Sequence, residues 1–219
     1  LSSLLIPAVP DPEHEHPHIS LRSVLGRPVV VALLLVAFLN QAAHGTYYTF
    51  FTLYLESFGH DKGVIGMIWA LSVGAEVAAF TLMARWMPRF GERNLLLVSL
   101  FLGTLRWLLT ALFPQSLELM FLVQMLHAAS FGVIHAVSIH MIHDLFRGKL
   151  QGRGQALYSS VSFGVGGGVG SLLGGIVWTQ LGAEAIFLFS ALLSAVALWV
   201  SWRWLYALER EPILESGVD

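Results

Sequence analysis

The stretch Leu117–Ile142, LELMFLVQMLHAASFGVIHAVSIHMI, has Glu118 as its only Asp, Glu, Lys or Arg. It is longer than the ~20 residues that a helix needs to cross a ~30 Å hydrocarbon core at 1.5 Å per residue. Gln124, His127 and His135 lie well inside this apolar run. The stretch therefore predicts a membrane-spanning helix with ionisable groups at mid-depth, where such groups are costly and indicate a functional site.

The whole chain has the composition of a membrane protein. It has 219 residues, of which 56% are hydrophobic and 12% charged, whereas soluble domains average about 45–50% and about 25%. Short alternating strand patterns are absent, so the long apolar segments predict helices that satisfy their own backbone groups in lipid. The expected fold is an all-α transmembrane bundle of six helices, at 28–55, 63–84, 94–113, 117–142, 156–181 and 183–206.

The polar ends and the basic residues predict the orientation. Residues 1–27 are rich in Pro and His and predict a cytoplasmic linker, either an internal loop of a longer protein or an artificial end, and 207–219 predict a cytoplasmic tail. Lys and Arg gather before the first span, in alternate connections and after the last span, whereas the other connections hold only Lys62. Because basic loops stay inside, both termini are expected to be cytoplasmic.

Four ionisable residues form the predicted proton-coupling set. Counting along the spans at 1.5 Å per residue places Glu76, Arg106, His127 and His135 within roughly 8 Å of the midplane, where each charge costs about 2.5–3.5 kcal/mol. A histidine that titrates near neutral pH beside a carboxylate is typical of proton relays. The alternatives are a static Glu76–Arg106 ion pair and hydrogen-bonded core histidines.

Helical periodicity selects a candidate binding surface. At 100° per residue, Gln124, His127, Phe131, His135 and Ser138 share an arc of about 80°. Asn40, His44, Tyr47 and Phe51 share a face of the first span, which Gly45 is expected to kink. Amide and aromatic groups suit a solute with an apolar body and a polar end, although they also occur as polar contacts between helices. The predicted substrate-binding residues are Asn40, Gln41, His44, Tyr47, Tyr48, Gln124 and Gln155.

The fifth span is dense in glycine. Small residues four apart let helix backbones approach closely in lipid. The spacing predicts either static packing or a sliding contact surface. The predicted packing residues are Gly164, Gly166, Gly168, Gly170 and Gly174.

Other classes of function fit less well. His135 and His140 lie about 140° apart on a helix, which is poor geometry for one metal, so neither a catalytic nor a metal site is predicted. The absence of cysteine excludes disulfides and thiolate chemistry. Ionisable residues at the midplane disfavour a non-transporting scaffold or subunit. Six spans after a polar loop instead fit one half of a 6+6 transporter.

Five stretches resemble the C-terminal half of the phenylpropionic acid transporter family, which belongs to the major facilitator superfamily and is similar to lactose permease and nucleoside–proton symporters. The resemblance covers residues 20–206. The stretches are FLNQ at 38–41 through HG to YYTFF at 47–51, IWAL at 68–71 with Glu76, LRW at 105–107, Gln124 through LHA and FG to HA at 135–136, and GQALY at 154–158.

The resemblance implies half of a 12-helix fold, with a missing N-terminal six-helix half as partner, in the lipid of a bacterial inner membrane. It implies proton-driven uptake of a small organic solute, such as 3-phenylpropionate, with sugars or nucleosides as alternatives. Protons as coupling ion, no further cofactor and no nucleic acid are expected. Lactose permease-like proteins use an acid, an arginine and a histidine on helices eight to ten, and Glu76, Arg106 and His127 stand on the matching helices. The carboxylate that follows that histidine has no counterpart here, nor does the aspartate of the superfamily's basic loop in residues 85–93.

Overall fold

The structure is a computed structural model that describes residues 20–205. All of its regular elements are helical in this part of the chain, and six helical stretches are long and apolar enough to span a membrane. The predicted all-α architecture of six membrane helices is thus confirmed. The elements are α1 (Leu21–Leu25), α2 (Pro28–Ser57), α3 (Lys62–Phe90), α4 (Glu92–Leu112), α5 (Leu117–Met125), a π-helical segment (Ala128–Val133), α6 (Ile134–Leu145), a 3-10 turn (Gly148–Leu150), α7 (Gln151–Ser159), a second π-helical segment (Ser160–Gly166), α8 (Gly167–Leu181) and α9 (Ala185–Trp204).

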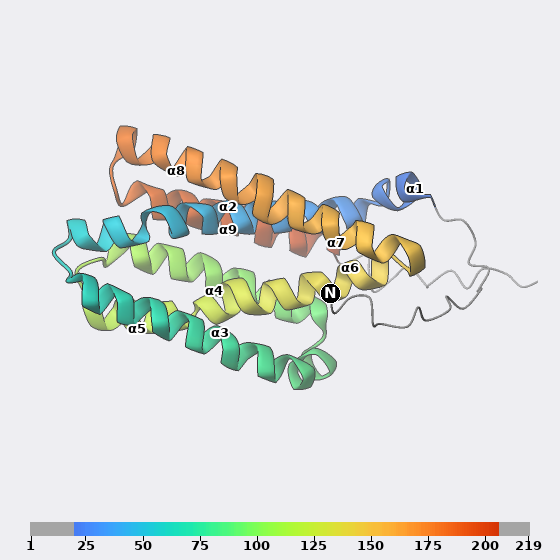
Figure 1. The fold of residues 1–219 in the computed structure, drawn as a ribbon, viewed down its shortest axis with the longest axis horizontal. Coiled ribbons are helices and arrows are strands. Elements are labelled where there is room, and N and C mark those ends of the chain that lie inside the picture. Colours follow the sequence, from blue (N-terminus) through green and yellow to red (C-terminus); the bar gives the residue numbers. More distant parts are fainter. Residues whose placement is uncertain (1–19, 206–219) are drawn as a thin grey trace, which may run out of the picture.

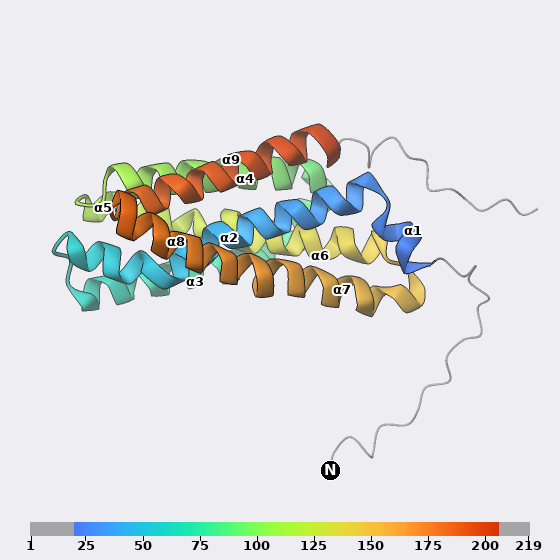
Figure 2. The same cartoon turned by 90° about the horizontal axis from the view of Figure 1, so that it is seen from above.

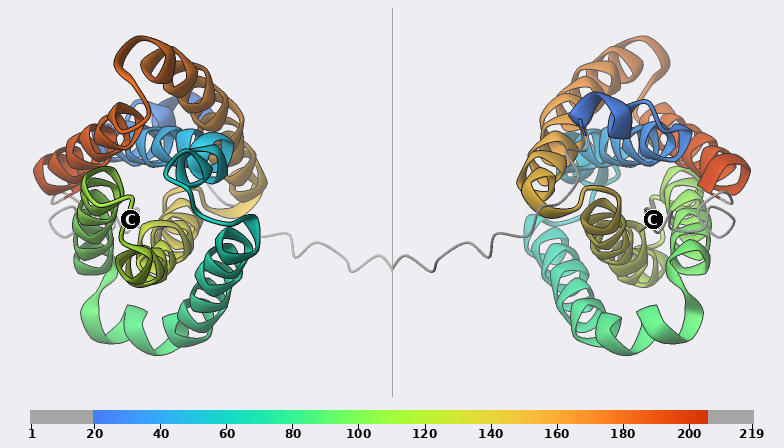
Figure 3. Two further views of the ribbon diagram at one scale, coloured as in Figure 1. Left: turned by 90° about the vertical axis from the view of Figure 1, so that its left-hand side faces the viewer. Right: turned by 90° about the vertical axis from the view of Figure 1, so that its right-hand side faces the viewer.

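The spans run alternately up and down, so that α1 and the end of α9 lie at the same end of the bundle (Figures 1 and 2). The basic connections α3–α4 and α6–α7 lie at this end as well. α2 is the most buried span and packs on α8 and α9, while α3 and the α7–α8 span are the most exposed. Seen end-on, α9 and α4 lie on one side of the bundle, and α7 and α3 lie on the other (Figure 3).

Several boundaries differ from the sequence estimates. α3 continues through the basic stretch to Phe90, because Pro88 falls in the last turn and Gly91, with φ of 75°, ends the helix. α7 begins at Gln151, five residues before the expected start. Within the expected linker, Ser20 caps the short helix α1 and Val24 is buried, whereas residues 1–19 and 206–219 lie outside the described part of the chain.

The glycine contact joins α8 to α2. Gly166, Gly170 and Gly174 face Phe38, Ala42 and Thr46, so a Cβ at any of the three would come too close to α2. Gly45 on α2 approaches the backbone of Gly167 in the same way. Side chains add hydrogen bonds across this contact, since Thr46 Oγ1 donates to the Gly170 carbonyl at 2.9 Å and Ser171 Oγ to that of Gly45 at 3.0 Å.

Two of the predicted packing glycines lie outside this contact. A Cβ at Gly164 or at Gly168 would meet nothing within 4 Å. They occupy the exposed side of the helix, which the small-residue spacing alone does not distinguish from the packed side. Gly45 lies inside α2, which is an uninterrupted α-helix from Pro28 to Ser57, and the π-helical interruptions lie in two other spans.

Candidate functional site

A polar layer crosses the bundle between two apolar clusters. On α4, Leu100 belongs to one cluster and Trp107 to the other, with Arg106 between them. On α3, Glu76 likewise lies between the two clusters, because Ile68 belongs to the cluster of Trp107 and Ala79 to the cluster of Leu100. The buried polar side chains of the layer are Asn40, Gln41, His44, Ser72, Ser99, Arg106, Gln124, His127, Ser130 and Ser194.

Arg106 is the centre of this layer. Its side chain is fully buried, with the guanidinium carbon 4.4 Å from the centre of the Tyr47 ring and 4.1 Å from that of Trp107. Nη2 donates to Gln124 Oε1 at 2.9 Å and Nη1 to Ser130 Oγ at 3.1 Å. Cation–π contacts and hydrogen bonds therefore replace water around this charge.

Within residues 20–205, no acidic side chain pairs with Arg106. Nε of Arg106 and Nε2 of Gln124 are buried donors without a partner. The Glu76–Arg106 ion pair considered from the sequence is not formed in this structure. Counting residues gives depth along a span but not which side chains of neighbouring helices face each other.

Glu76 instead pairs with His127. Their closest atoms, Glu76 Oε2 and His127 Nε2, are 3.4 Å apart, and the side chains are 17% and 3% exposed. Gly132 packs against the aliphatic part of the Glu76 side chain, because a Cβ there would be 3.1 Å from Glu76 Cγ. Two predicted residues from different spans thus meet at mid-depth, with Arg106 in the same layer.

His44 connects α2 to the arginine. Its Nδ1 lies 2.8 Å from the carbonyl oxygen of Asn40, which can only accept, so Nδ1 carries the proton. The Nε2 lone pair then faces Arg106 Nη1 at 3.5 Å. A backbone carbonyl one helical turn away thus sets the tautomer and aims the imidazole at the guanidinium.

Aromatic side chains form a wall beside these groups. Tyr48 and Trp69 are stacked at 6.0 Å with an interplanar angle of 18°, and Tyr47 lies 4.6 Å from Trp69. Tyr47 also donates its hydroxyl to Gln124 Oε1 at 3.2 Å. Tyr48 is 45% exposed, so the wall has an open side and a side closed against Arg106.

The first π-helical segment carries a column of stacked rings. His127 and Phe131 are 5.3 Å apart at 7°, and Phe131 and His135 are 6.0 Å apart at 14°. His135 Nδ1 is 3.0 Å from the hydroxyl of Tyr158 on α7. Phe163, in the second π-helical segment, packs edge-on against both Phe131 and His135.

One predicted residue lies apart from the layer, and some members of the site were not predicted. Gln155 is exposed on α7, whereas Gln41 is buried in the layer but makes no hydrogen bond to the Arg106 cluster. Sequence reasoning did not select Trp69, Trp107 or Ser130, and it placed Tyr158 at the inner mouth without its contact to His135. Helical spacing was an available signal for two of them, since Ser130 follows His127 by three residues and Trp69 precedes Glu76 by seven.

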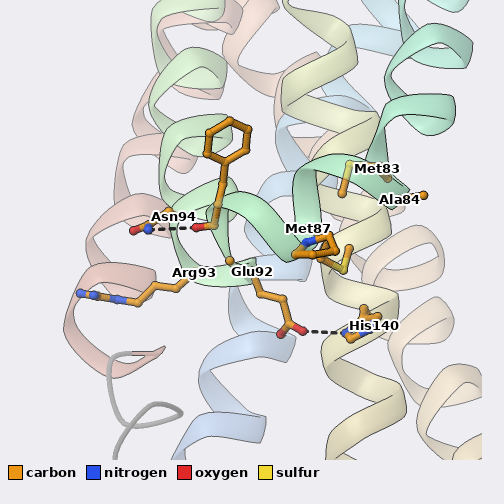
Figure 4. A pocket seen from close by; sticks show the side chains of 10 residues that line it. Met83, Ala84, Met87, Glu92, Arg93, Asn94 and His140 are labelled. Atoms are coloured by element: carbon orange, nitrogen blue, oxygen red, sulfur yellow. Dashed lines mark hydrogen bonds and ion pairs between the residues drawn. The ribbon is translucent and has the colours of Figure 1, made fainter.

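A second polar group lies at the end of the bundle that carries the basic loops. His140 Nδ1 is 2.6 Å from Glu92 Oε1 and 3.6 Å from Asp144 Oδ2, beside a pocket of about 730 Å³ (Figure 4). Of the described residues, these three form the one group of His, Asp and Glu with all ligand atoms within 4.8 Å, and His135 is not part of it. A single nitrogen faces both carboxylates, so the arrangement is an ion pair that links α4 to α6.

Residues 9–189 match the MFS_1 like family. The chain is similar to the "Probable 3-phenylpropionic acid transporter" of Escherichia coli (strain K12), with 31% identity over 74% of this chain and 42% of that protein. It is also similar to the "Maltose permease" of Geobacillus stearothermophilus, with 26% identity over 69% of this chain and 38% of that protein. The "Uncharacterized transporter YwbF" of Bacillus subtilis (strain 168) is 18% identical over 79% of this chain and 43% of its own length. The chain thus spans about two fifths of the length of these relatives.

Proposed function

This chain belongs to the MFS_1 like family of membrane transporters, and from this membership we propose that it is the C-terminal six-helix half of a proton-coupled symporter for a small organic anion. The substrate is an aromatic acid of the 3-phenylpropionate type. The site lies between this half and an N-terminal half of six helices. Both ends of this half face the cytoplasm, because the basic connections gather at that end of the bundle.

The observation that carries the proposal is the buried, uncompensated charge of Arg106. A buried ion is costly unless it is paired, and no acid among residues 20–205 pairs with this one. Unpartnered donors on Arg106 and Gln124 leave room for an acceptor with negative charge. A substrate carboxylate supplies both the charge and the acceptor oxygens.

The aromatic wall supports the rest of the substrate. Tyr48, Trp69 and Tyr47 offer ring faces next to the arginine, and stacked or edge-on rings add about 0.5–1.5 kcal/mol beyond burial. Arg106 is fully buried, so side chains around it move aside before the carboxylate binds. The printed name of the E. coli relative points to the same class of solute.

Glu76 and His127 provide the coupling site. In the outward-open state this pair takes up a proton, and the substrate carboxylate then binds Arg106. Rocking of the two halves exposes the loaded site to the cytoplasm. There the charge of Arg106, in the same dry layer, favours departure of the proton because like charges repel strongly at low dielectric.

The test is uptake of labelled 3-phenylpropionate by the full-length protein in proteoliposomes, with and without an inward proton gradient. Accumulation above the external concentration that collapses with a protonophore supports both the substrate and the coupling. If folded protein gives neither uptake nor exchange of this acid, the substrate assignment is wrong.

A sugar substrate is the second candidate, because one relative is named a maltose permease. Sugars have no carboxylate and would leave the charge of Arg106 uncompensated. Counterflow with each labelled solute separates the two candidates. Labelled 3-phenylpropionate should exchange under the first and labelled maltose under the second.

A further inference from the structure

The ring column contains two imidazoles that cannot exchange a proton directly. The Phe131 ring lies parallel to both His127 and His135 and separates them. A phenyl ring neither binds nor releases a proton. Any proton that passes from the level of His127 to that of His135 therefore needs another carrier.

Glu76 has the position of such a carrier. It approaches the column from α3, with its carboxylate 3.4 Å from His127 Nε2. Its Cγ packs on Gly132, which lies between His127 and His135 in the sequence and has no side chain of its own. His135 lies on the same side of its span as His127, because both rings stack on Phe131.

The two histidines differ in what holds them. His127 Nδ1 is buried without a partner, and the charged or titratable groups in ring or ion-pair contact with His127 are Glu76, His44, Tyr47 and Tyr48. His135 Nδ1 is hydrogen-bonded at 3.0 Å to Tyr158, whose side chain is 3% exposed on α7. The groups around His135 are Tyr158, Glu76 and the uncharged rings of Phe131 and Phe163.

We propose that His135, held by Tyr158, is the cytoplasm-facing proton acceptor, to which Glu76 passes the proton that it receives at the level of His127. This inference rests on the proposed proton coupling and adds its inner step. The Glu76 O–H bond breaks and a bond to the Nε2 lone pair of His135 forms, giving a carboxylate and an imidazolium. Water on the cytoplasmic side then takes the proton from Nε2. In this step Tyr158 is a positioning residue: its oxygen accepts from Nδ1–H of His135, and the lone pair is then on Nε2.

The experiment measures gradient-driven uptake of 3-phenylpropionate by the full-length protein while internal and external pH are varied separately. His135→Gln should abolish accumulation, with counterflow exchange within about twofold of wild type because exchange needs no net proton release. Tyr158→Phe removes only the hydroxyl and should slow uphill uptake about three- to tenfold, the effect of one lost hydrogen bond. For Tyr158→Phe, the way the uptake rate depends on internal pH should change, whereas its dependence on external pH should stay as in the wild type.

Tyr54→Phe is the matched control, because Tyr54 is a fully buried tyrosine whose hydroxyl donates to the Thr110 carbonyl in the other apolar cluster. It should leave both pH profiles unchanged. Gly132→Ala is a second variant that leaves the hydroxyl in place, and it should slow uphill uptake by pressing on Glu76 Cγ.

If His135→Gln and Tyr158→Phe both keep wild-type coupling and a wild-type dependence on internal pH, His135 is not the inner proton acceptor. The proposed function would still stand. Wild-type protein that exchanges substrate but never responds to a proton gradient would overturn both.

Discussion

Two glutamate–histidine pairs link neighbouring helices of this molecule, and they differ in what surrounds them. Glu92 and His140 approach to 2.6 Å with side chains 29% and 52% exposed, whereas Glu76 and His127 are 3.4 Å apart and 17% and 3% exposed. The shorter contact is screened by water and has Asp144 as a further partner. The longer one lies in the dry layer of Arg106, where an uncompensated charge has a large effect. Burial and the balance of charge, more than the length of a contact, therefore distinguish the candidate coupling site from a structural ion pair.

The largest expected effect comes from Arg106→Gln. Both uptake and exchange should fall by at least about a hundredfold, because a buried charge-assisted contact to substrate of about 3 kcal/mol or more is lost. Thermal stability should not fall with them, since no buried acid loses its partner. Arg147→Gln, outside the layer, is the control. Exchange near wild-type levels for Arg106→Gln would remove the arginine from substrate binding.

A comparison of Glu76→Gln with Glu92→Gln tests the two pairs directly. Glu76→Gln should abolish uphill uptake and leave exchange measurable, because the amide cannot carry the proton. Glu92→Gln should keep uphill uptake within about threefold, in line with the ~0–1 kcal/mol of an exposed pair. Accumulation by both variants at wild-type levels would abolish the functional distinction between the pairs.

Tyr48→Ala and Phe90→Ala compare aromatic rings of nearly equal exposure, 45% and 46%, in the two regions. Tyr48→Ala should raise KM for 3-phenylpropionate about three- to tenfold through the loss of ring contacts. Phe90, which lines the pocket beside His140, should leave KM unchanged when truncated. Equal KM shifts would place the substrate elsewhere.

The smallest expected effect is that of His140→Gln. It removes the group that links α4 to α6, and an exposed pair contributes ~1 kcal/mol or less. The melting temperature should fall by a few degrees at most, about 2–4 °C per kcal/mol for a chain of this size, with uphill uptake unchanged. Loss of coupling in this variant would transfer the functional role to the exposed pair.

The sequence predicted well how far along its span each residue lies. It predicted poorly which residues of neighbouring spans are in contact. Apolar length sets the six spans, and counting along them brought Glu76, Arg106 and His127 to one layer. Which of them pair depends on the rotation of each helix about its axis, so Glu76 meets His127 and not Arg106. The same limit explains Gly164 and Gly168, which satisfy the packing spacing but face away from α2. The contact of Tyr158 with His135 was not predicted, because the two residues lie on different spans.

The two π-helical segments, Ala128–Val133 and Ser160–Gly166, meet through Phe131 and Phe163. A π-helical segment accommodates about one residue more than an α-helix of the same rise. The extra residue is absorbed locally, so deleting one residue from the first segment would restore regular α-helix while His127 and His135, which flank it, keep their orientations. In the regular α-helices on either side, the same deletion would turn everything beyond it by about 100°. In an alignment of related sequences, one-residue gaps should therefore gather in this segment and leave the two histidines in place.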